Sequence, residues 1–467
     1  MPWSNAGAGR GVGGRSVVVD VPGRGLRKAA VQPLLTLDRR GALSSAHVQL
    51  SAETLGVAER TVWRWSGWAL RLRRDVRRQG SYTALVNSGI SAEHPAGFEF
   101  DFSYWFDCDC GRRVEVTAGE YEQQCGGDEE SYPVCECGDS IDISTARPAL
   151  RDLDDIDCHD DQVDRHLWYH TSPYQDWPSP RYRSDITALI KRSLLSPSEH
   201  EKAIEGRTSL ALHLGTYAAA VENMLRRMHD QDSPTHRYWL HQVQVQLGAT
   251  DLAPGVRGEL STWFGDVPMT ALTDLGARAV RYVNTHESPG SISLAIDATV
   301  IVRVRTIPLP PAASALPATE AGEQAVTRAV AALTAAQQLR PDTTGIPEEE
   351  IFESELDLVI AQMRGRIVDD EAVQRANEFA SQFEESRNQE HEALSSLRAE
   401  LAEIYLPNVN PQLRTRVDDA IAVGTAPGEY HLRLRQLAAL IAQPHQVLRY
   451  FDNAPWRKFD PPSRLTS

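Results

Sequence analysis

Alternation of apolar and polar side chains marks several short segments in the middle of the chain. The clearest lies at residues 236–247, HRYWLHQVQVQL. Successive side chains of a β-strand point to opposite faces, so this pattern predicts a strand with one buried and one solvated face. The expected buried face holds Trp239, His241, Val243, Val245 and Leu247, and the solvated face holds Gln242, Gln244 and Gln246. Further strands are predicted at residues 167–171, 210–214 and 299–309, and after the turn at 287–290.

Helical segments separate these strands. Gly215 and Thr216 form a predicted turn, after which a helix begins near Tyr217 with Thr216 as its cap. Another helix is predicted near residues 274–282. Because strands and helices are mixed within residues 160–310, we predict a mixed α/β domain there.

The last third of the chain has a helical pattern. Residues 311–345 read as a Pro/Ala-rich linker and a helix, and residues 346–467 as a helical domain. Within it, residues 369–406 predict one amphipathic helix of roughly 55 Å, with a possible break in the polar stretch EESRNQEHE. Its apolar face holds Val373, Ala376, Phe379, Phe383, Leu394, Leu397, Leu401 and Ile404. Two interpretations stay open: a helical bundle of its own, or an arm for self-association or partner binding.

Length and charge limit the number of domains and the kinds of partner that we expect. A chain of 467 residues indicates about two to four domains. No apolar run is long enough to cross a bilayer, and the Gly/Arg-rich start lacks the apolar segment of a secretory signal. We therefore expect a cytoplasmic protein without membrane contact, with residues 1–41 as a disordered tail. The net charge of −16 argues against nucleic-acid binding by bulk electrostatics, although not against a local basic patch.

Such a patch follows two predicted short helices at residues 46–55 and 57–68, which a turn at Gly56 separates. The motif LGVAERTVWRW resembles the helix-turn-helix of bacterial transposases and regulators over about residues 42–70, within a predicted helix-turn-helix-like segment at residues 42–80. The resemblance implies DNA contacts by Arg60, Thr61 and Arg64. The alternative is a small helical hairpin whose tryptophans only pack.

The cysteines form a repeat. All six lie between Cys108 and Cys158, too few for a disulfide-built scaffold, which favours a reducing compartment and a metal site. CDCGRRVEV and CECGDSIDI both read Cys-acid-Cys-Gly, two spacers and then a predicted strand. The expected zinc ligands are Cys108, Cys110, Cys135 and Cys137.

Residues 95–146 thus resemble a zinc ribbon, although the usual knuckle of that family is Cys-x-x-Cys. A closed site of four thiolates would be structural, because catalytic zinc keeps an open position. Cys125 and the pair Cys158 and His159 are spare ligand candidates. The alternative is a hairpin pair with incidental cysteines.

Three short motifs occur in order in the α/β region: YHT at a strand end, HLGT before a helix, and a glutamate beside a turn. This order and spacing resemble the ADP-ribosyltransferase fold, in its His-Tyr-Glu subgroup, over residues 160–310. The resemblance implies NAD as substrate, with Glu287 and His170 as catalytic residues. The implied NAD-binding residues are His170, Thr171, His213, Gly215, Thr216 and Tyr217.

The chemistry of ADP-ribosyl transfer explains why these residue types would be needed. ADP-ribosyl transfer passes through a cation-like ribose, which a carboxylate such as Glu287 stabilises. His170 would hydrogen-bond the other ribose, with Thr171 helping, and Tyr217 would lie near the nicotinamide. The family sets its tyrosine differently, and His213 stands where an aromatic ring is usual. The alternative roles are a hydrogen-bonded polar residue for the histidine and a turn residue for the glutamate.

Together these patterns predict an α+β multidomain protein: a helix-turn-helix, a zinc-ribbon-like β unit, an ADP-ribosyltransferase-like domain and a C-terminal helical domain. The preferred function is an ADP-ribosyltransferase or NAD glycohydrolase that modifies a macromolecule, with a protein as a possible acceptor. The alternatives are a DNA-binding protein of a mobile element and a non-catalytic partner-binding or assembly protein. The enzyme is preferred because the α/β region is the only part of the sequence that groups a candidate carboxylate, a histidine and hydroxyls.

Overall fold

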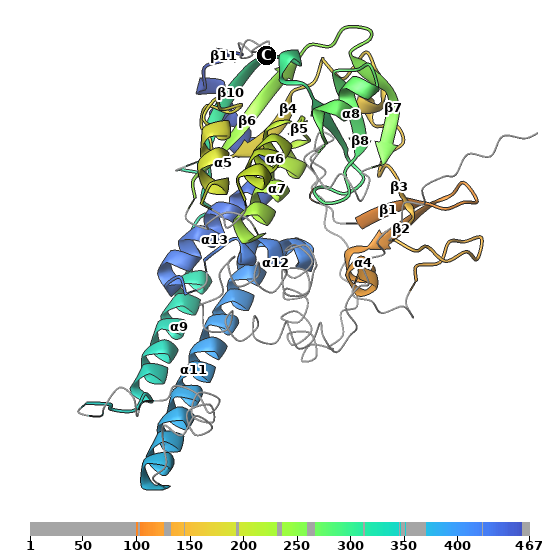
Figure 1. Ribbon diagram of the computed structural model, residues 1–467. Helices are drawn as coiled ribbons and strands as arrows, with labels where there is room; N and C mark the ends of the chain where they lie inside the picture. Colours follow the sequence, from red (N-terminus) through yellow and green to blue (C-terminus); the bar gives the residue numbers. More distant parts are fainter. Residues whose placement is uncertain are drawn as a thin grey trace, which may run out of the picture. The chain divides into compact units, whose positions relative to one another are not determined.

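A computed structural model of the chain combines α-helices with several β-sheets (Figure 1). It describes residues 100, 103–125, 132–143, 145–192, 196–230, 236–258, 267–311, 313–344, 346, 351, 370–422 and 424–459. All of these belong to one unit, Ser91–Ser467. The expected tail at residues 1–41 and the helix-turn-helix at 42–80, with Arg60, Thr61 and Arg64, lie outside the described residues.

The first sheet is small and antiparallel, with the strand order β2-β1-β3. Its elements are β1 (Ser103–Asp107), β2 (Arg113–Thr117), the helix α4 (Ala118–Cys125) and β3 (Arg147–Pro148). Tyr104 and Phe106 bury their rings in its own core, and Tyr104 stacks on Tyr121 of α4 at 3.6 Å. This sheet lies in the region where the cysteine repeat predicts a β unit.

Two four-stranded sheets make up the α/β region. The second sheet has the order β11-β10-β6-β4 and the third has the order β5-β9-β8-β7. The second sheet consists of β4 (Trp168–Ser172), β6 (Tyr238–Val245), β10 (Ile301–Leu309) and β11 (Arg457–Lys458). The third consists of β5 (Leu212–Leu214), β7 (Leu252–Gly258), β8 (Ala279–Val283) and β9 (Ile292–Ile296). The two share a core, in which Trp168 and Val243 of the second sheet lie with Leu294 of the third.

Helices connect these strands. They are α5 (Tyr182–Ile190), α6 (Pro197–Thr208), α7 (Tyr217–Asp230) and α8 (Met269–Asp274). Helix α7 begins at the predicted residue, and the Thr216 hydroxyl accepts a hydrogen bond from the amide of Ala219 at 3.1 Å, as a cap does. The ring of Tyr217 meets that of Tyr169 on β4 edge to face at 5.8 Å, so α7 packs on one face of the second sheet.

The helix predicted near residues 274–282 is wrong. Helix α8 ends at Asp274, Gly276 has a φ of +62°, and Ala279–Val283 is a strand with every residue buried. A strand buried on both faces lacks the apolar-polar alternation by which strands are recognised.

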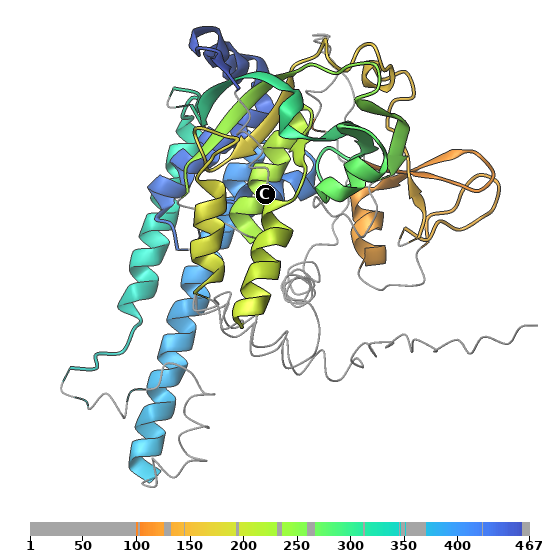
Figure 2. The same cartoon turned by 45° about the horizontal axis from the view of Figure 1, so that its top comes forward.

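The C-terminal region is helical, as expected. It contains α9 (Glu320–Gln338), α11 (Asp370–Tyr405), α12 (Pro411–Asp419), α13 (Pro427–Ala442), α14 (Pro444–Leu448) and the 3₁₀ turn η4 (Arg449–Asn453). Helices α9 and α11 lie side by side (Figure 1 and Figure 2), joined by the ion pair between Arg328 of α9 and Glu400 of α11. Helix α11 continues through EESRNQEHE, where the buried Ser386 hydroxyl donates to the carbonyl of Ala336 at 2.8 Å. None of the helices in the described ranges is long and apolar enough to cross a membrane.

The C-terminal helices and the second sheet share one core. Leu240 and Ile307 of the sheet lie in it with Leu401, Leu437 and Phe451 of the helical region. The face of β6 that carries the glutamines is therefore not fully solvated, and Gln242 is only 5% exposed. The solvated face predicted for this strand is wrong at that position, because a segment some 200 residues later covers it.

Candidate functional site

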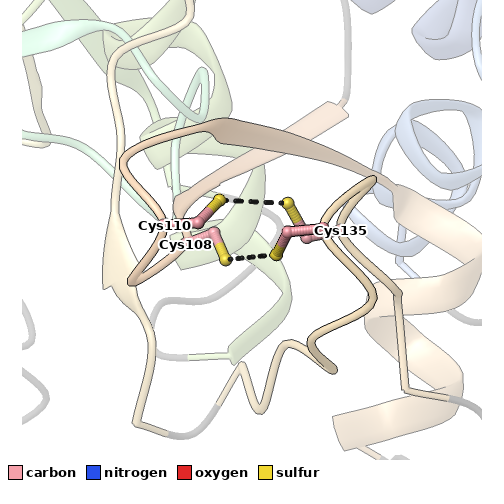
Figure 3. A group of neighbouring side chains, drawn as sticks. Cys108, Cys110 and Cys135 are labelled. Carbon is pink, nitrogen blue, oxygen red and sulfur yellow. Dashed lines mark hydrogen bonds between the residues drawn. The ribbon is translucent and has the colours of Figure 1, made fainter.

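Four cysteine side chains meet in the first sheet. The sulfur atoms of Cys108, Cys110, Cys135 and Cys137 all lie within 4.8 Å of one another. Two cross pairs, Cys108–Cys137 and Cys110–Cys135, are each separated by 3.6 Å (Figure 3). Zinc–thiolate bonds of about 2.3 Å at tetrahedral angles place sulfurs about 3.8 Å apart. The predicted cysteines are therefore close enough to hold a metal ion, and their geometry is compatible with zinc.

The repeat in the sequence is a repeat in backbone geometry. In the first knuckle the Cys108 amide donates to the carbonyl of Arg112, and the Gly111 amide donates to the carbonyl of Cys108, both at 2.8 Å. The second knuckle repeats both bonds at Cys135 and Gly138, again at 2.8 Å. Gly111 and Gly138 have φ values of +84° and +95°, a conformation that favours glycine. This tight turn allows a Cys-x-Cys spacing to present both sulfurs at one point.

Burial divides each knuckle in the same way. Cys108 and Cys135 are buried in the small core beside Phe106 and Val116, whereas the second cysteine of each knuckle is exposed. The first sulfur of each pair is thus fixed by packing, and the second by the turn.

The surroundings of the cysteines differ from expectation in one respect. The strand predicted after the second knuckle is not present: within residues 132–143, only a single bridge joins Val134 to Ser140. Cys158 ends the 3₁₀ turn η1 (Ile156–Cys158) and is not part of the cluster, and the side chain of Cys125 lies outside the described residues. Neither spare ligand is needed to complete a four-thiolate set.

His170 is held from two sides. Its Nδ1 lies 2.8 Å from the carbonyl oxygen of His213, and its ring stacks on Trp177 at 4.2 Å. Burial lowers the pKa of His170 well below its usual value, and the nearby His241 lowers it further. His170 is therefore neutral at physiological pH. The hydroxyl of Thr171, on the opposite face of β4, donates to the carbonyl of Ala220 at 2.8 Å.

The HLGT segment joins the two large sheets. Gly215 exchanges both backbone hydrogen bonds with Tyr169, at 2.9 and 3.0 Å. A Cβ at Gly215 would lie 3.0 Å from the Cβ of Ala219, a tight contact, so the close approach favours glycine. His213 Nδ1 meets the hydroxyl of Tyr282 at 2.9 Å.

Tyr217 belongs to the core. It is 1% exposed, and its hydroxyl donates to the carbonyl of Leu440 on α13 at 2.9 Å. Phe100 meets its ring edge to face at 6.1 Å.

Glu287 lies beside α7, further along that helix than Tyr217. Its Oε1 accepts hydrogen bonds from Arg226 Nε at 2.7 Å and from Asn223 Nδ2 at 3.4 Å. Burial alone would raise the pKa of Glu287, but the Arg226 guanidinium outweighs it and the pKa is lowered. Glu287 is therefore a carboxylate, 8% exposed.

A second buried carboxyl, that of Glu222, was not predicted from the sequence. Its Oε2 accepts from Arg416 at 2.9 Å and from the Ser288 amide at 3.1 Å. Burial raises the pKa of Glu222 to about 7, although Arg416 opposes this. The available signal was an acid within the apolar run AAAVENML. Glu222 and Glu287 thus sit in one network but favour different protonation states.

Hydrogen bonds link His170, Thr171, His213 and Gly215 through β4, β5 and α7, and a ring contact joins Tyr217 to Tyr169 on β4. Glu287 is attached to the same helix by side chains. Across the described ranges, no hydrogen bond, ion pair or ring contact joins Glu287 directly to His170. Comparisons with protein-family models, curated proteins and solved structures find no match to this chain.

Proposed function

We propose that the chain is an NAD-using enzyme, an ADP-ribosyltransferase or NAD glycohydrolase, with a structural zinc site. The observation that supports this most is that the region with the three motifs contains a neutral histidine, His170, and a buried, ionised carboxylate, Glu287. His170 and Glu287 are 117 positions apart in the printed sequence; His170 is positioned by β4 and β5, and Glu287 by side chains of α7. Buried groups with displaced pKa values are a common mark of catalytic sites.

His170 has a defined hydrogen-bonding role in this proposal. Because its Nδ1 faces the carbonyl of His213, Nδ1 donates and Nε2 remains as an acceptor. Such an acceptor suits a ribose hydroxyl, and the stacked Trp177 fixes the ring plane. The histidine binds and orients the sugar without exchanging a proton.

Glu287 supplies the negative charge. The Arg226 contact keeps the carboxylate ionised, ready to stabilise a cation-like ribose as the nicotinamide bond breaks. Arg226 is 33% exposed in its side chain, and it binds Glu287 through Nε. Tyr217 is not assigned to the nicotinamide, because its ring is buried and its hydroxyl is bound to α13.

The cysteine centre has a separate role. Cys108, Cys110, Cys135 and Cys137 would bind zinc as four thiolates, and a closed set leaves no position for a substrate. The metal would join two turns that otherwise share a small core and the exposed ion pair between Arg112 and Glu136.

Release of nicotinamide from NAD by the purified full-length protein tests the enzyme proposal. We expect turnover that Glu287→Gln removes and that a matched variant of the exposed Glu205 on α6 retains. Absence of release, with no rise in melting temperature on adding NAD, would favour the partner-binding alternative. DNA contact through Arg60, Thr61 and Arg64 stays a prediction, to be tested by duplex binding before and after deletion of residues 1–80.

A further inference from the structure

A polar cavity lies on the face of the second sheet that the C-terminal region covers. Its volume is about 440 Å³, within the range of small-molecule sites. The lining side chains include Tyr169, Gln242 and Arg305 from the strands, and His445, Arg449 and Asp452 from α14 and η4. Because Tyr169 and His170 are neighbours on one strand, they point to opposite faces. Neither His170, Thr171, His213 nor Glu287 is among the lining residues, so the cavity and the proposed NAD site use different side chains.

The floor of this cavity is a row of three side chains across three strands. Tyr169 and Arg305 are both direct neighbours of Gln242 in the strand register. Arg305 Nε donates to Gln242 Oε1 at 2.6 Å, and Gln242 Nε2 donates to the Tyr169 hydroxyl at 2.9 Å. The phenol oxygen is thus used as an acceptor, and its own O–H is available as a donor. Arg305 fixes the orientation of the Gln242 amide, and the amide in turn fixes the direction in which the Tyr169 hydroxyl donates.

Arg305 is fixed from the other side as well. Its NH1 donates to the carbonyl of Phe451 at 2.8 Å, and its guanidinium lies 4.7 Å from the centre of the Trp456 ring. These contacts hold the planar group in place while leaving further N–H donors. The residues that fix it belong to the C-terminal segment, so the site forms only when that segment covers the sheet.

The rim adds more positive charge than negative. Arg449 and His445 are exposed at the entrance, and Asp452 is the single acid among the lining residues. With Arg305 in the floor, two guanidinium groups face one carboxylate. Several N–H and O–H donors from separate elements suit an anion with three terminal oxygens better than one with two.

From this geometry we infer that the cavity binds a phosphate group, carried by a small phosphorylated molecule. Arg305 of β10 and Arg449 of η4 bind the phosphate oxygens, and the Tyr169 hydroxyl of β4 donates to them as well. The volume leaves room for an organic portion beside the phosphate. The C-terminal segment then contributes ligand-binding residues and not only core packing.

Calorimetric titration of the full-length protein with inorganic phosphate, at constant ionic strength, tests this inference. We expect saturable binding that is tighter than that of acetate. Arg449→Ala and Tyr169→Phe should each raise the Kd about tenfold, because each removes one donor to a charged group. Arg303→Ala is the matched control: Arg303 lies two residues earlier on β10 and donates to Gln244 at 2.6 Å, outside the cavity. It should change the Kd less than about twofold, since salt screens its charge.

Three results would overturn the inference. They are a titration without saturation, acetate binding as tight as phosphate, and a loss of affinity in the Arg303 variant equal to that in the Arg449 variant. Tyr169→Phe keeps the buried ring, and Arg449 is exposed, so circular dichroism should show both variants folded. Nicotinamide release is measured independently, so failure of the NAD proposal leaves this result unaffected.

Discussion

Arg416 of α12 donates through NH1 to Oε2 of Glu222 on α7 at 2.9 Å, and the same nitrogen reaches the carbonyl of His286 at 3.2 Å. One guanidinium thus connects the C-terminal helices, the helix that follows the HLGT segment, and the loop that carries Glu287. Glu222 has a fully buried side chain, whereas that of Arg416 is 23% exposed. The protonation state of the Glu222 carboxyl therefore depends on how α7 and α12 pack together.

The burial of Glu222, which Arg416 offsets only in part, makes stability depend on pH. Its pKa is raised from 4.5 to about 7 in the folded state, chiefly by burial. The stabilisation from the protonated carboxyl is fully present below pH 4.5 and is lost as pH rises through about 7. Glu222→Gln cannot ionise, so its stability relative to the parent should increase between pH 5 and pH 8, by at most about 3 kcal/mol.

Urea denaturation of both proteins at pH 5 and pH 8 measures the effect. The exposed Glu205 of α6 provides the control, since Glu205→Gln should alter stability equally at both pH values. A difference between the Glu222 variant and the parent that does not change with pH would contradict the raised pKa.

The cysteine centre predicts a defined metal content. The full-length protein should contain about one zinc ion per chain. Cys135→Ser should lower this to well below half, because one of four thiolates is replaced by a hydroxyl that binds zinc weakly. Cys158→Ser is the matched control, since Cys158 is reduced and lies outside the cluster. Equal zinc in both variants, measured by elemental analysis, would reject this ligand set.

Glu287→Gln tests the proposed catalytic carboxylate. We expect nicotinamide release to fall about 100-fold or more, because the amide cannot balance the charge of the ribose. Since Arg226 lowers the pKa of Glu287, this carboxyl should not contribute an acid limb to the rate between pH 5 and pH 8. Glu205→Gln, assayed in parallel, should keep the parent rate. A Glu287 variant that is folded by circular dichroism and fully active would remove this residue from the mechanism.

Local geometry explains what the sequence predicted well. The two Cys-x-Cys-Gly turns depend on residues at most four positions apart, as in the bond from the Cys108 amide to the Arg112 carbonyl. Helix α11 likewise follows from periodicity within one segment. Such features need no knowledge of the remote chain.

Remote contacts account for the rest. Gln242 was expected in solvent, yet it is buried and accepts a hydrogen bond from Arg305. Arg305 in turn donates to the carbonyl of Phe451. The pKa of Glu222 is raised by burial, and its partner Arg416 lies 194 positions away in the sequence. Neither the alternation of a strand nor the spacing of a helix contains this information, so a single sequence did not indicate these pairs.

Tyr217 provides a final test, of structure and not of catalysis. Its hydroxyl donates to the carbonyl of Leu440 at 2.9 Å, within the last turn of α13, where helix carbonyls lack intrahelical partners. Tyr217→Phe should therefore destabilise the protein by about 1–2 kcal/mol, because a buried carbonyl loses its donor. Tyr182→Phe is the control, since that exposed hydroxyl reaches the carbonyl of Arg207 only at 3.5 Å and should matter little. If urea denaturation finds equal stability in both variants, the bond from α7 to α13 does not hold the C-terminal helices in place.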